Sequence, residues 1–167
     1  MHRHFRHYVR RHEPRGLAHH PLKSAVGAIL ALSAVGLLAV YTGLPMLIAP
    51  FGASAVLLFG QPKSPLSQPA NVVGGYLIAA VVGSIAAHAL PGVWLAGAIG
   101  VGVAVGLMLF LRVTHPPAGA VPLVAVASQF EAPVLFEVVL GGSLLLVAIA
   151  VLHHAIPPRQ QYPIRID

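Results

Sequence analysis

Residues 112–120 have the sequence Arg-Val-Thr-His-Pro-Pro-Ala-Gly-Ala, and this stretch interrupts an otherwise apolar chain. It places a cation, a hydroxyl and an imidazole just before two prolines: Arg112, Thr114, His115, Pro116 and Pro117. Proline lacks the backbone N–H and disfavours helix in the residue before it, so we expect no continuous helix through His115. Polar residues beside such a break at membrane depth are typical of a transport site. A proline-punctuated loop between helices is the alternative interpretation.

The composition of the chain is that of a membrane protein. Of its 167 residues, 57% are hydrophobic and only 8% are charged, whereas a soluble domain carries about 25% charged residues. Several apolar segments are long enough to cross a hydrocarbon core of about 30 Å. The absence of cysteine from the sequence excludes disulfide and thiolate chemistry. We therefore predict an all-α, polytopic transmembrane helical bundle whose main partner is the lipid bilayer.

The charges divide the chain into three parts. Six of the ten Lys and Arg residues lie in the first 23 positions, which predicts a basic, His-rich cytoplasmic tail over residues 1–24. The transmembrane domain follows over residues 25–154, and residues 155–167 form a second cytoplasmic tail. Such asymmetry indicates membrane orientation rather than nucleic-acid binding. The spacing of His2, His4 and His7 lacks a second ligand cluster, so a solvated arm near lipid headgroups is preferred to a metal site.

Four long apolar spans are expected, at residues 25–48, 71–90, 93–111 and 132–154. Asn71 is the predicted N-cap of the second span. Of two shorter apolar pieces, residues 50–60 begin with Pro50 and residues 118–128 follow Pro117. A helix of that length covers only about 16 Å, roughly half of the hydrocarbon core. The fold expected is thus four long spans plus two short, proline-interrupted segments.

The two halves of the chain resemble each other at an offset of 67 residues. This offset superimposes the following residues: Pro50, Gly52 and Ala53 on Pro117, Gly119 and Ala120, and Gly74, Gly75 and Leu77 on Gly141, Gly142 and Leu144. Each half also has the same order of features: long span, proline break, short piece, and long span with a Gly-Gly pair. We predict a two-fold internal repeat, with units of about residues 22–88 and 89–155. Paired, interrupted segments of this kind indicate a transport site.

Two membrane topologies fit this pattern. If each short piece re-enters and returns, the chain has four spans, and Lys63 and Arg112 face outside. If each short piece crosses, the chain crosses six times as inverted repeats, all Lys and Arg lie inside, and Glu131 lies outside. Segment length favours the first topology and charge bias the second, which we prefer. Both place the N- and C-termini in the cytoplasm, as expected for a multi-pass protein of the cell inner membrane.

Three blocks of sequence carry a family resemblance. They are PFGASAVLLF at residues 50–59, SPLSQPANVVGG at residues 64–75 and THPPAGA at residues 114–120. Over about residues 20–163 the chain resembles the HPP family of integral membrane proteins. The resemblance implies a multi-span protein, usually described with four transmembrane helices, that is a candidate transporter. Plastid and cyanobacterial members are associated with nitrite transport. Some bacterial relatives carry C-terminal CBS domains, and since this sequence has none, nucleotide regulation through them is not expected.

Candidate pathway residues cluster around the two breaks. Lys63 and Arg112 could attract an anion, or instead snorkel and fix orientation. His115 could bind an anion or relay a proton, or instead brace the loop. Neutral donors that would not trap an ion are Ser54, Ser64, Ser67, Gln68, Asn71 and Thr114. The backbone N–H groups after Pro50 and Pro117 also suit a small anion, because Gly52 and Gly119 allow close approach.

Glu137 is the one acid inside a predicted long span, so it is a second candidate for proton coupling, with an interfacial structural role as the alternative. The sequence contains no pattern typical of an enzyme active site, a cofactor site or a zinc site. We predict a membrane transporter or channel for a small anion, with nitrite as one candidate. The rival hypothesis is a membrane-embedded assembly or interaction subunit without transport activity. Homo-oligomerisation is left open.

These two hypotheses differ in what they place between the breaks. A transporter should gather His115, Asn71, Gln68 and the two small-residue helix starts around one cavity. An assembly subunit should fill the same space with Leu, Ile and Val.

Overall fold

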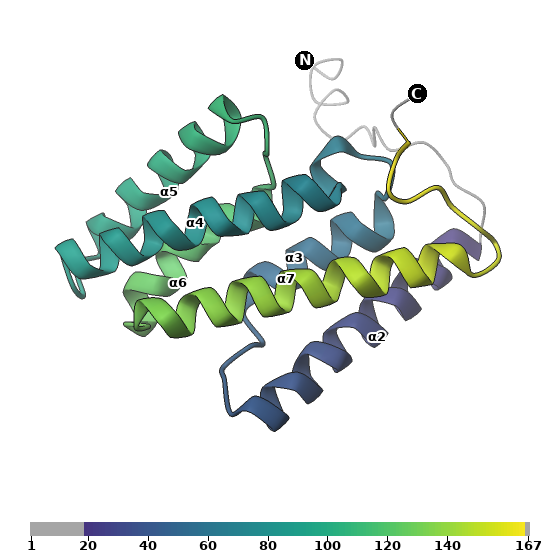
Figure 1. Cartoon of the computed structure of the whole chain (residues 1–167), viewed down its shortest axis with the longest axis horizontal. Coiled ribbons are helices and arrows are strands. Elements are labelled where there is room, and N and C mark those ends of the chain that lie inside the picture. Colours follow the sequence, from purple (N-terminus) through teal and green to yellow (C-terminus); the bar gives the residue numbers. More distant parts are fainter. Residues whose placement is uncertain (1–18, 166–167) are drawn as a thin grey trace, which may run out of the picture.

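The computed structural model describes residues 19–165, and every regular element among them is a helix (Figure 1). In chain order the elements are α2 (His19–Thr42), α3 (Ala49–Ala55), the π-helical turn η1 (Val56–Gly60), the 3-10 turn η2 (Pro65–Ser67), α4 (Pro69–Ala89), α5 (Trp94–Phe110), the 3-10 turn η3 (Pro116–Ala120), α6 (Val121–Ser128) and α7 (Ala132–Ala155). The all-α prediction is confirmed.

Three helices are long and apolar enough to cross a membrane. They are α2, α4 and α7, with 24, 21 and 24 residues, against the ~20 residues that a bilayer requires. The fourth predicted span corresponds to α5, which has 17 residues and is shorter than the expected range of 93–111. The two short segments run over residues 49–60 and 116–128.

The first long helix differs from the predicted span 25–48 at both ends. It begins within the predicted tail, because the charge of Lys23 is accommodated: its Nζ donates to the carbonyls of Ile156 and Pro158, both at 2.6 Å. It ends early because Gly43 adopts a left-handed φ of 71°, which terminates a helix. Residues 1–18, which hold the predicted His-rich motif, lie outside the described residues.

The prolines of both breaks begin helices instead of standing outside them. Pro50 lies in the first turn of α3, and Pro116 and Pro117 open η3. The first turn of a helix does not need the missing N–H, and the fixed φ of proline suits it. The break before Pro116 is present as predicted, since residues 111–115 are not helical and Arg112 has a φ of 59°.

Both described termini lie at one end of the molecule, together with two loops. Ser24 Oγ donates to Phe59 O at 2.6 Å, and Tyr162 Oη donates to Ser67 O at 2.9 Å. The amide of Asn71 brings the loop 111–115 to the same place. Figure 1 shows the start of α2 and the yellow segment after α7 at this end. We call it the basic end, because all described Lys and Arg residues lie there: Lys23, Lys63, Arg112, Arg159 and Arg165.

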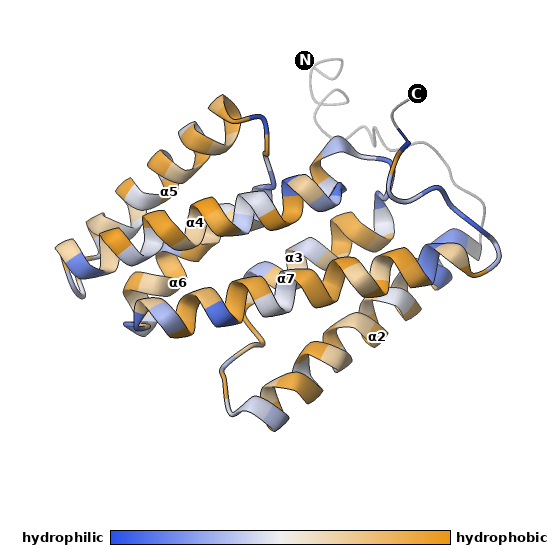
Figure 2. Cartoon of the chain, viewed as in Figure 1, coloured by the Kyte–Doolittle hydropathy of each residue, from blue (hydrophilic) through white to orange (hydrophobic). Residues whose placement is uncertain are grey.

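The opposite end holds the α4–α5 turn and the α6–α7 connection, where Glu131 lies. Between the two ends, α4 packs against α5, α6 and α7, while α2 packs on α7 and η1. Figure 2 shows that α2 and α5 are largely hydrophobic along their length, and large apolar side chains of both helices are exposed, with Phe110 84% exposed and Val40 81% exposed. Such surfaces are those that lipid covers.

Glycines of α4 and α7 permit close packing that a larger residue would block. A Cβ on Gly75 would lie 2.8 Å from His115 Cβ, and one on Gly142 would overlap the Phe51 ring. By contrast, a Cβ on Gly52 would have no atom within 4 Å, and one on Gly119 would meet only Val105 at 3.9 Å. These two glycines therefore do not pack closely against other backbone, and their close approach to a small anion stays a prediction.

We predict that Gly75→Ala destabilises the fold by about 1–3 kcal/mol, because the added methyl group must displace the buried His115 backbone region. The matched control is Gly102→Ala on α5, where a Cβ would have no neighbour within 4 Å. That change should be neutral or gain about 0.5–1 kcal/mol of helix propensity. Thermal unfolding in detergent measures both, and equal melting temperatures for the two variants would contradict the packing described.

Candidate functional site

Two fully buried polar side chains meet where the two short segments come together. His115, at the start of η3, and Ser54, on α3, are both 0% exposed. Ser54 Oγ lies 2.7 Å from His115 Nε2 and 2.8 Å from the hydroxyl of Tyr76, which comes from α4. His115 Nδ1 lies 2.8 Å from Leu66 O. Three segments of the first half of the chain therefore surround one histidine of the second half.

The geometry fixes the direction of these hydrogen bonds for a neutral imidazole. A carbonyl oxygen only accepts, so Nδ1 carries the proton and donates to Leu66. Nε2 must then accept from Ser54, whose oxygen accepts in turn from Tyr76. The result is a single chain of donors from Tyr76 through Ser54 and His115 to Leu66. A protonated imidazole would donate from both nitrogens, so Ser54 would accept from His115 and donate to Tyr76 without any bond being lost.

A second set of polar contacts closes the end of the first short segment. The last carbonyls of a helix have no partner within it. Ser67 Oγ donates to Leu57 O at 3.1 Å, His154 Nε2 to Leu58 O at 2.8 Å, and Ser24 Oγ to Phe59 O. Because His154 donates through Nε2, its Nδ1 is an acceptor, and this buried nitrogen has no partner.

The remaining predicted neutral donors bind backbone, and one of them, Ser64, also lines a cavity at the basic end. Asn71 lies inside α4, so its predicted N-cap role is wrong; Gln68 holds that position because Pro69 already starts the helix. The Asn71 amide instead donates to Thr114 O at 3.1 Å, and the Thr114 hydroxyl lies 3.4 Å from Met108 O. Ser64 Oγ accepts from the Leu66 N–H.

Gln68 spans three segments of backbone. Its amide nitrogen donates to Pro62 O and Ser64 O, both at 2.9 Å, and its oxygen accepts from the N–H of Ile164 at the same distance. The side chain thus folds the loop 61–68 and fastens the segment after α7 to it.

The predicted charged residues do not converge on His115. Lys63 and Arg112 are both exposed, on different loops of the basic end, and only Lys63 lines a cavity there. Glu137 is exposed on the surface of α7, six residues from the start of that helix. Electrostatic attraction toward the buried histidine is therefore weak in this conformation.

The space between the two breaks is apolar. A groove of about 620 Å³ lies between the short segments and contains the predicted prolines; its lining is Ala49, Pro50, Ala53, Val56, Leu57, Pro116, Pro117 and Ala120. Gly52 lines a neighbouring groove, and Gly119 is buried. The two breaks do come together as predicted, but His115, Asn71 and Gln68 face protein and not this space.

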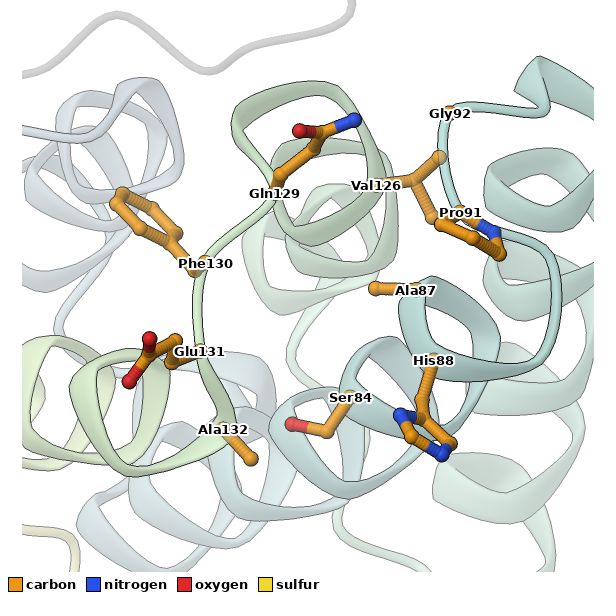
Figure 3. A pocket seen from close by; sticks show the side chains of 10 residues that line it. All are labelled: Ser84, Ala87, His88, Pro91, Gly92, Val126, Gln129, Phe130, Glu131 and Ala132. Carbon is orange, nitrogen blue, oxygen red and sulfur yellow. The ribbon is translucent and has the colours of Figure 1, made fainter.

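A cavity of about 450 Å³ opens at the opposite end, between the last turns of α4 and the α6–α7 connection (Figure 3). It contains His88, Gln129 and Glu131. Ser84 also lines it, and the hydroxyl of Ser84 is buried without a hydrogen-bond partner. The cavity therefore offers a donor, an imidazole and a carboxylate to a polar solute.

Sequence reasoning missed Tyr76, His154 and Tyr162 as polar partners. Tyr76 lies in a long apolar span, and a buried tyrosine hydroxyl usually finds a hydrogen-bond partner, which is the signal that could have identified it. The roles of His154 and Tyr162 depend on a carbonyl about 95 residues away, Leu58 O and Ser67 O respectively. No local pattern encodes such a contact.

These features define a multi-span helical membrane protein with two interrupted segments. The chain matches the family model described as HPP, transmembrane region, over residues 13–163, and it belongs to this family. Two transmembrane proteins of Dictyostelium discoideum are similar: one is 35% identical over 127 residues and the other 38% over 126, in each case 71% of this chain. The chain spans less than half of each relative, 45% and 40% of their lengths. No solved structure matches it.

We predict that Ser54→Ala destabilises the protein more than Tyr76→Phe. Removing the Ser54 hydroxyl leaves two buried groups without partners, His115 Nε2 and the Tyr76 hydroxyl, at about 1–3 kcal/mol each. Tyr76→Phe deletes one bond and leaves no donor unpaired, which costs about 1 kcal/mol. Melting temperatures in detergent should therefore rank wild type, Tyr76→Phe and Ser54→Ala in descending order; the reverse order of the two variants contradicts the proposed chain.

Proposed function

We propose that this protein is a membrane transporter for a small anion, with nitrite among the candidates. The observation that carries the proposal is the buried chain from Tyr76 to Leu66, in which His115 of the second half is held by the first half. A fully hydrogen-bonded contact between two halves at the crossing of two broken segments is what a closed gate requires. The family resemblance supports the choice of substrate class.

The contacts of the helices support an inverted repeat. α4 packs against α5 and against η3–α6, and α7 packs against α2 and against α3–η1. These pairs exchange when one half is superimposed on the other. The Gly-Gly pairs follow the same exchange: Gly75 faces His115 of the second half, and Gly142 faces Phe51 of the first.

This arrangement supports six crossings with the basic end in the cytoplasm. The loop 61–68 contacts the segment after α7, so the chain between α2 and α4 has returned to the side from which it started. The non-helical residues before each short segment, 43–48 and 113–115, add to the distance across the membrane that the short helix alone does not cover. All described Lys and Arg residues then face inside, as the positive-inside rule requires, in the inner membrane that we expect for this protein.

The two ends of the interface between the halves differ. At the basic end, the bonds of His115 and the bond from Asn71 to Thr114 O hold the halves together. At the opposite end, the cavity at His88 and Glu131 separates α4 from the α6–α7 connection. We interpret this state as closed to the cytoplasm and open to the other side, as alternating access requires. Because Glu131 repels a lone anion, a proton that accompanies the anion would favour its uptake.

A second function, that of an assembly subunit without transport, is favoured by one specific observation. The groove between the breaks is lined by Ala, Pro, Val and Leu, and the predicted pathway donors are bound to backbone. Flux decides between the two functions. Purified protein in liposomes should move nitrite faster than protein-free liposomes and faster than Ser54→Ala protein of equal content, with Gly102→Ala as the unaffected control. Wild-type flux equal to that of empty liposomes would contradict nitrite transport and leave the assembly role as the favoured function.

For the topology, we predict opposite labelling of two single cysteines in this cysteine-free chain. Lys63→Cys should resist a membrane-impermeant maleimide in intact cells whose outer barrier is opened, because its loop is cytoplasmic. Pro91→Cys, in the exposed α4–α5 turn, should react. The four-span topology gives the inverse pattern, so one experiment separates the two. Detergent-solubilised protein, in which both sites react, serves as the control.

For proton coupling, we predict that His115→Gln inserts, retains part of the flux and loses its pH dependence in the range below the ordinary histidine pKa of ~6.5, because a fully buried imidazole resists protonation. Glutamine can replace one hydrogen bond of the imidazole but cannot titrate. Proteoliposome flux at stepped external pH measures this. Wild-type flux that is constant over the range removes the protonation role, and a variant that keeps the response transfers the role to Glu137 or Glu131. A variant that does not insert assigns His115 to bracing the break.

A further inference from the structure

A polar cavity of about 660 Å³ lies at the basic end, to one side of the interface between the halves. It lies between the first turns of α2, the loop after η1 and the segment after α7. Its lining carries two cations from distant parts of the sequence, Lys63 and Arg159, beside several amides and hydroxyls: Ser24, Gln61, Ser64, Gln160 and Gln161. The volume is that of a small-molecule site, and the charge favours an anionic group.

The backbone on either side of Lys63 is held in place. The Gln68 amide donates to Pro62 O and to Ser64 O, the two residues that flank Lys63. The loop therefore presents the ammonium group from a fixed base, although the side chain itself is exposed.

The backbone around Arg159 is held in the same way. Lys23 Nζ donates to Pro158 O at 2.6 Å, and the Gln160 N–H donates to His154 O at 3.1 Å. Tyr162, two residues further on, anchors the segment through its bond to Ser67 O. Burial raises the pKa of the Tyr162 hydroxyl, so this anchor remains a donor throughout the physiological pH range. Two cations that face one cavity are thus positioned by separate sets of bonds.

An apolar groove continues from this cavity toward the middle of the molecule. It has a volume of about 280 Å³ and shares Ser24 and Gly60 with the polar cavity. Its other lining residues are apolar and come from α2, α3 and η1: Ala25, Ala28, Leu32, Gly52, Ala55, Val56 and Phe59. From Ala25 to Leu32 the helix rises about 10 Å, which is two-thirds of the ~15 Å hydrocarbon depth of one leaflet.

We propose that the cavity and the groove together bind one anionic phospholipid of the leaflet at the basic end. The phosphate headgroup lies between Lys63 and Arg159, and one acyl chain lies along the groove between α2 and α3. A free anion would use the cavity and leave the groove empty, whereas a lipid uses both because they are continuous. Gly52 lines this groove, and its lack of a side chain leaves room for the acyl chain. Lys63 then binds lipid and does not belong to the transport pathway, so this site is independent of whether the protein carries an anion.

The test is lipid retention by the full chain, measured by native mass spectrometry from detergent micelles. Dioleoyl phosphatidylglycerol should be retained as one molecule per chain, and dioleoyl phosphatidylcholine should not. Lys63→Gln and Arg159→Gln should each weaken retention about fivefold, as expected for one charge near a membrane surface. Arg112→Gln removes a charge at the same end but outside the cavity, and it should have no effect.

The groove has its own matched pair of variants. Gly52→Leu should fill it and abolish retention, while Gly102→Leu, equally free of neighbours but on α5, should leave retention unchanged. Equal retention of both lipids, or full retention by Gly52→Leu, would overturn the proposal. Displacement of the lipid by glycerol phosphate or inorganic phosphate at the same concentration as by short-chain phosphatidylglycerol would also overturn it, because the acyl chain would then contribute nothing. The charge variants lie on exposed side chains, so the test does not depend on the folding of Gly52→Leu.

Discussion

Backbone groups that a broken helix leaves unpaired must find partners inside the protein, because a bilayer offers none. This constraint accounts for several of the buried polar side chains. Ser67, His154 and Ser24 take the last carbonyls of the first short segment. His115 takes Leu66 O and Asn71 takes Thr114 O at the second break. An HPP sequence can therefore place prolines and glycines in apolar segments only if it also supplies these few donors.

The same contacts couple distant parts of the chain. Two of these hydrogen bonds join the two halves of the chain. His115 and His154 belong to the second half, and the carbonyls that accept from them, Leu66 O and Leu58 O, belong to the first. The same hydrogen bonds therefore pair the free backbone groups at the breaks and hold the two halves together. A pathway that opened between the halves at the basic end would have to exchange these bonds for bonds to water or to solute. The buried serine between an imidazole and a phenol makes such an exchange feasible, since a hydroxyl can donate or accept.

Much of the fold follows from the sequence because it is a matter of segment length and proline placement. The helices α4, α5 and α7 begin and end within about two residues of the predicted spans, a normal uncertainty for helix ends. The predicted start of α2 is too late, because the charge of Lys23 indicates a solvated tail. In the structure Lys23 belongs to the helix, and Ile156 O and Pro158 O accept its hydrogen bonds. The glycines that pack closely could not be told from the others, since close packing depends on which helix faces them.

The candidate site was predicted in part. The sequence identified His115 and Ser54 as polar residues at the two breaks, and the structure brings them into contact. It could not reveal that Tyr76 completes the chain or that the space beside it is apolar, because both depend on the packing of α4 against the short segments. The sequence also could not predict that Lys63 and Arg112 lie apart, since two exposed loops at one end can point in different directions.

The bond from Lys23 to the carbonyls after α7 has a consequence for how the protein is made. Its partners, Ile156 and Pro158, are synthesised 133 and 135 residues after it. Throughout translation the first helix therefore carries an ammonium group whose final acceptors do not yet exist, and the same is true of Leu58 O until His154 emerges from the ribosome. Until residues 154–158 have emerged, these groups must be paired with other partners, such as water or lipid headgroups. The emergence of residues 154–158, rather than insertion of any one helix, is the step that completes these contacts.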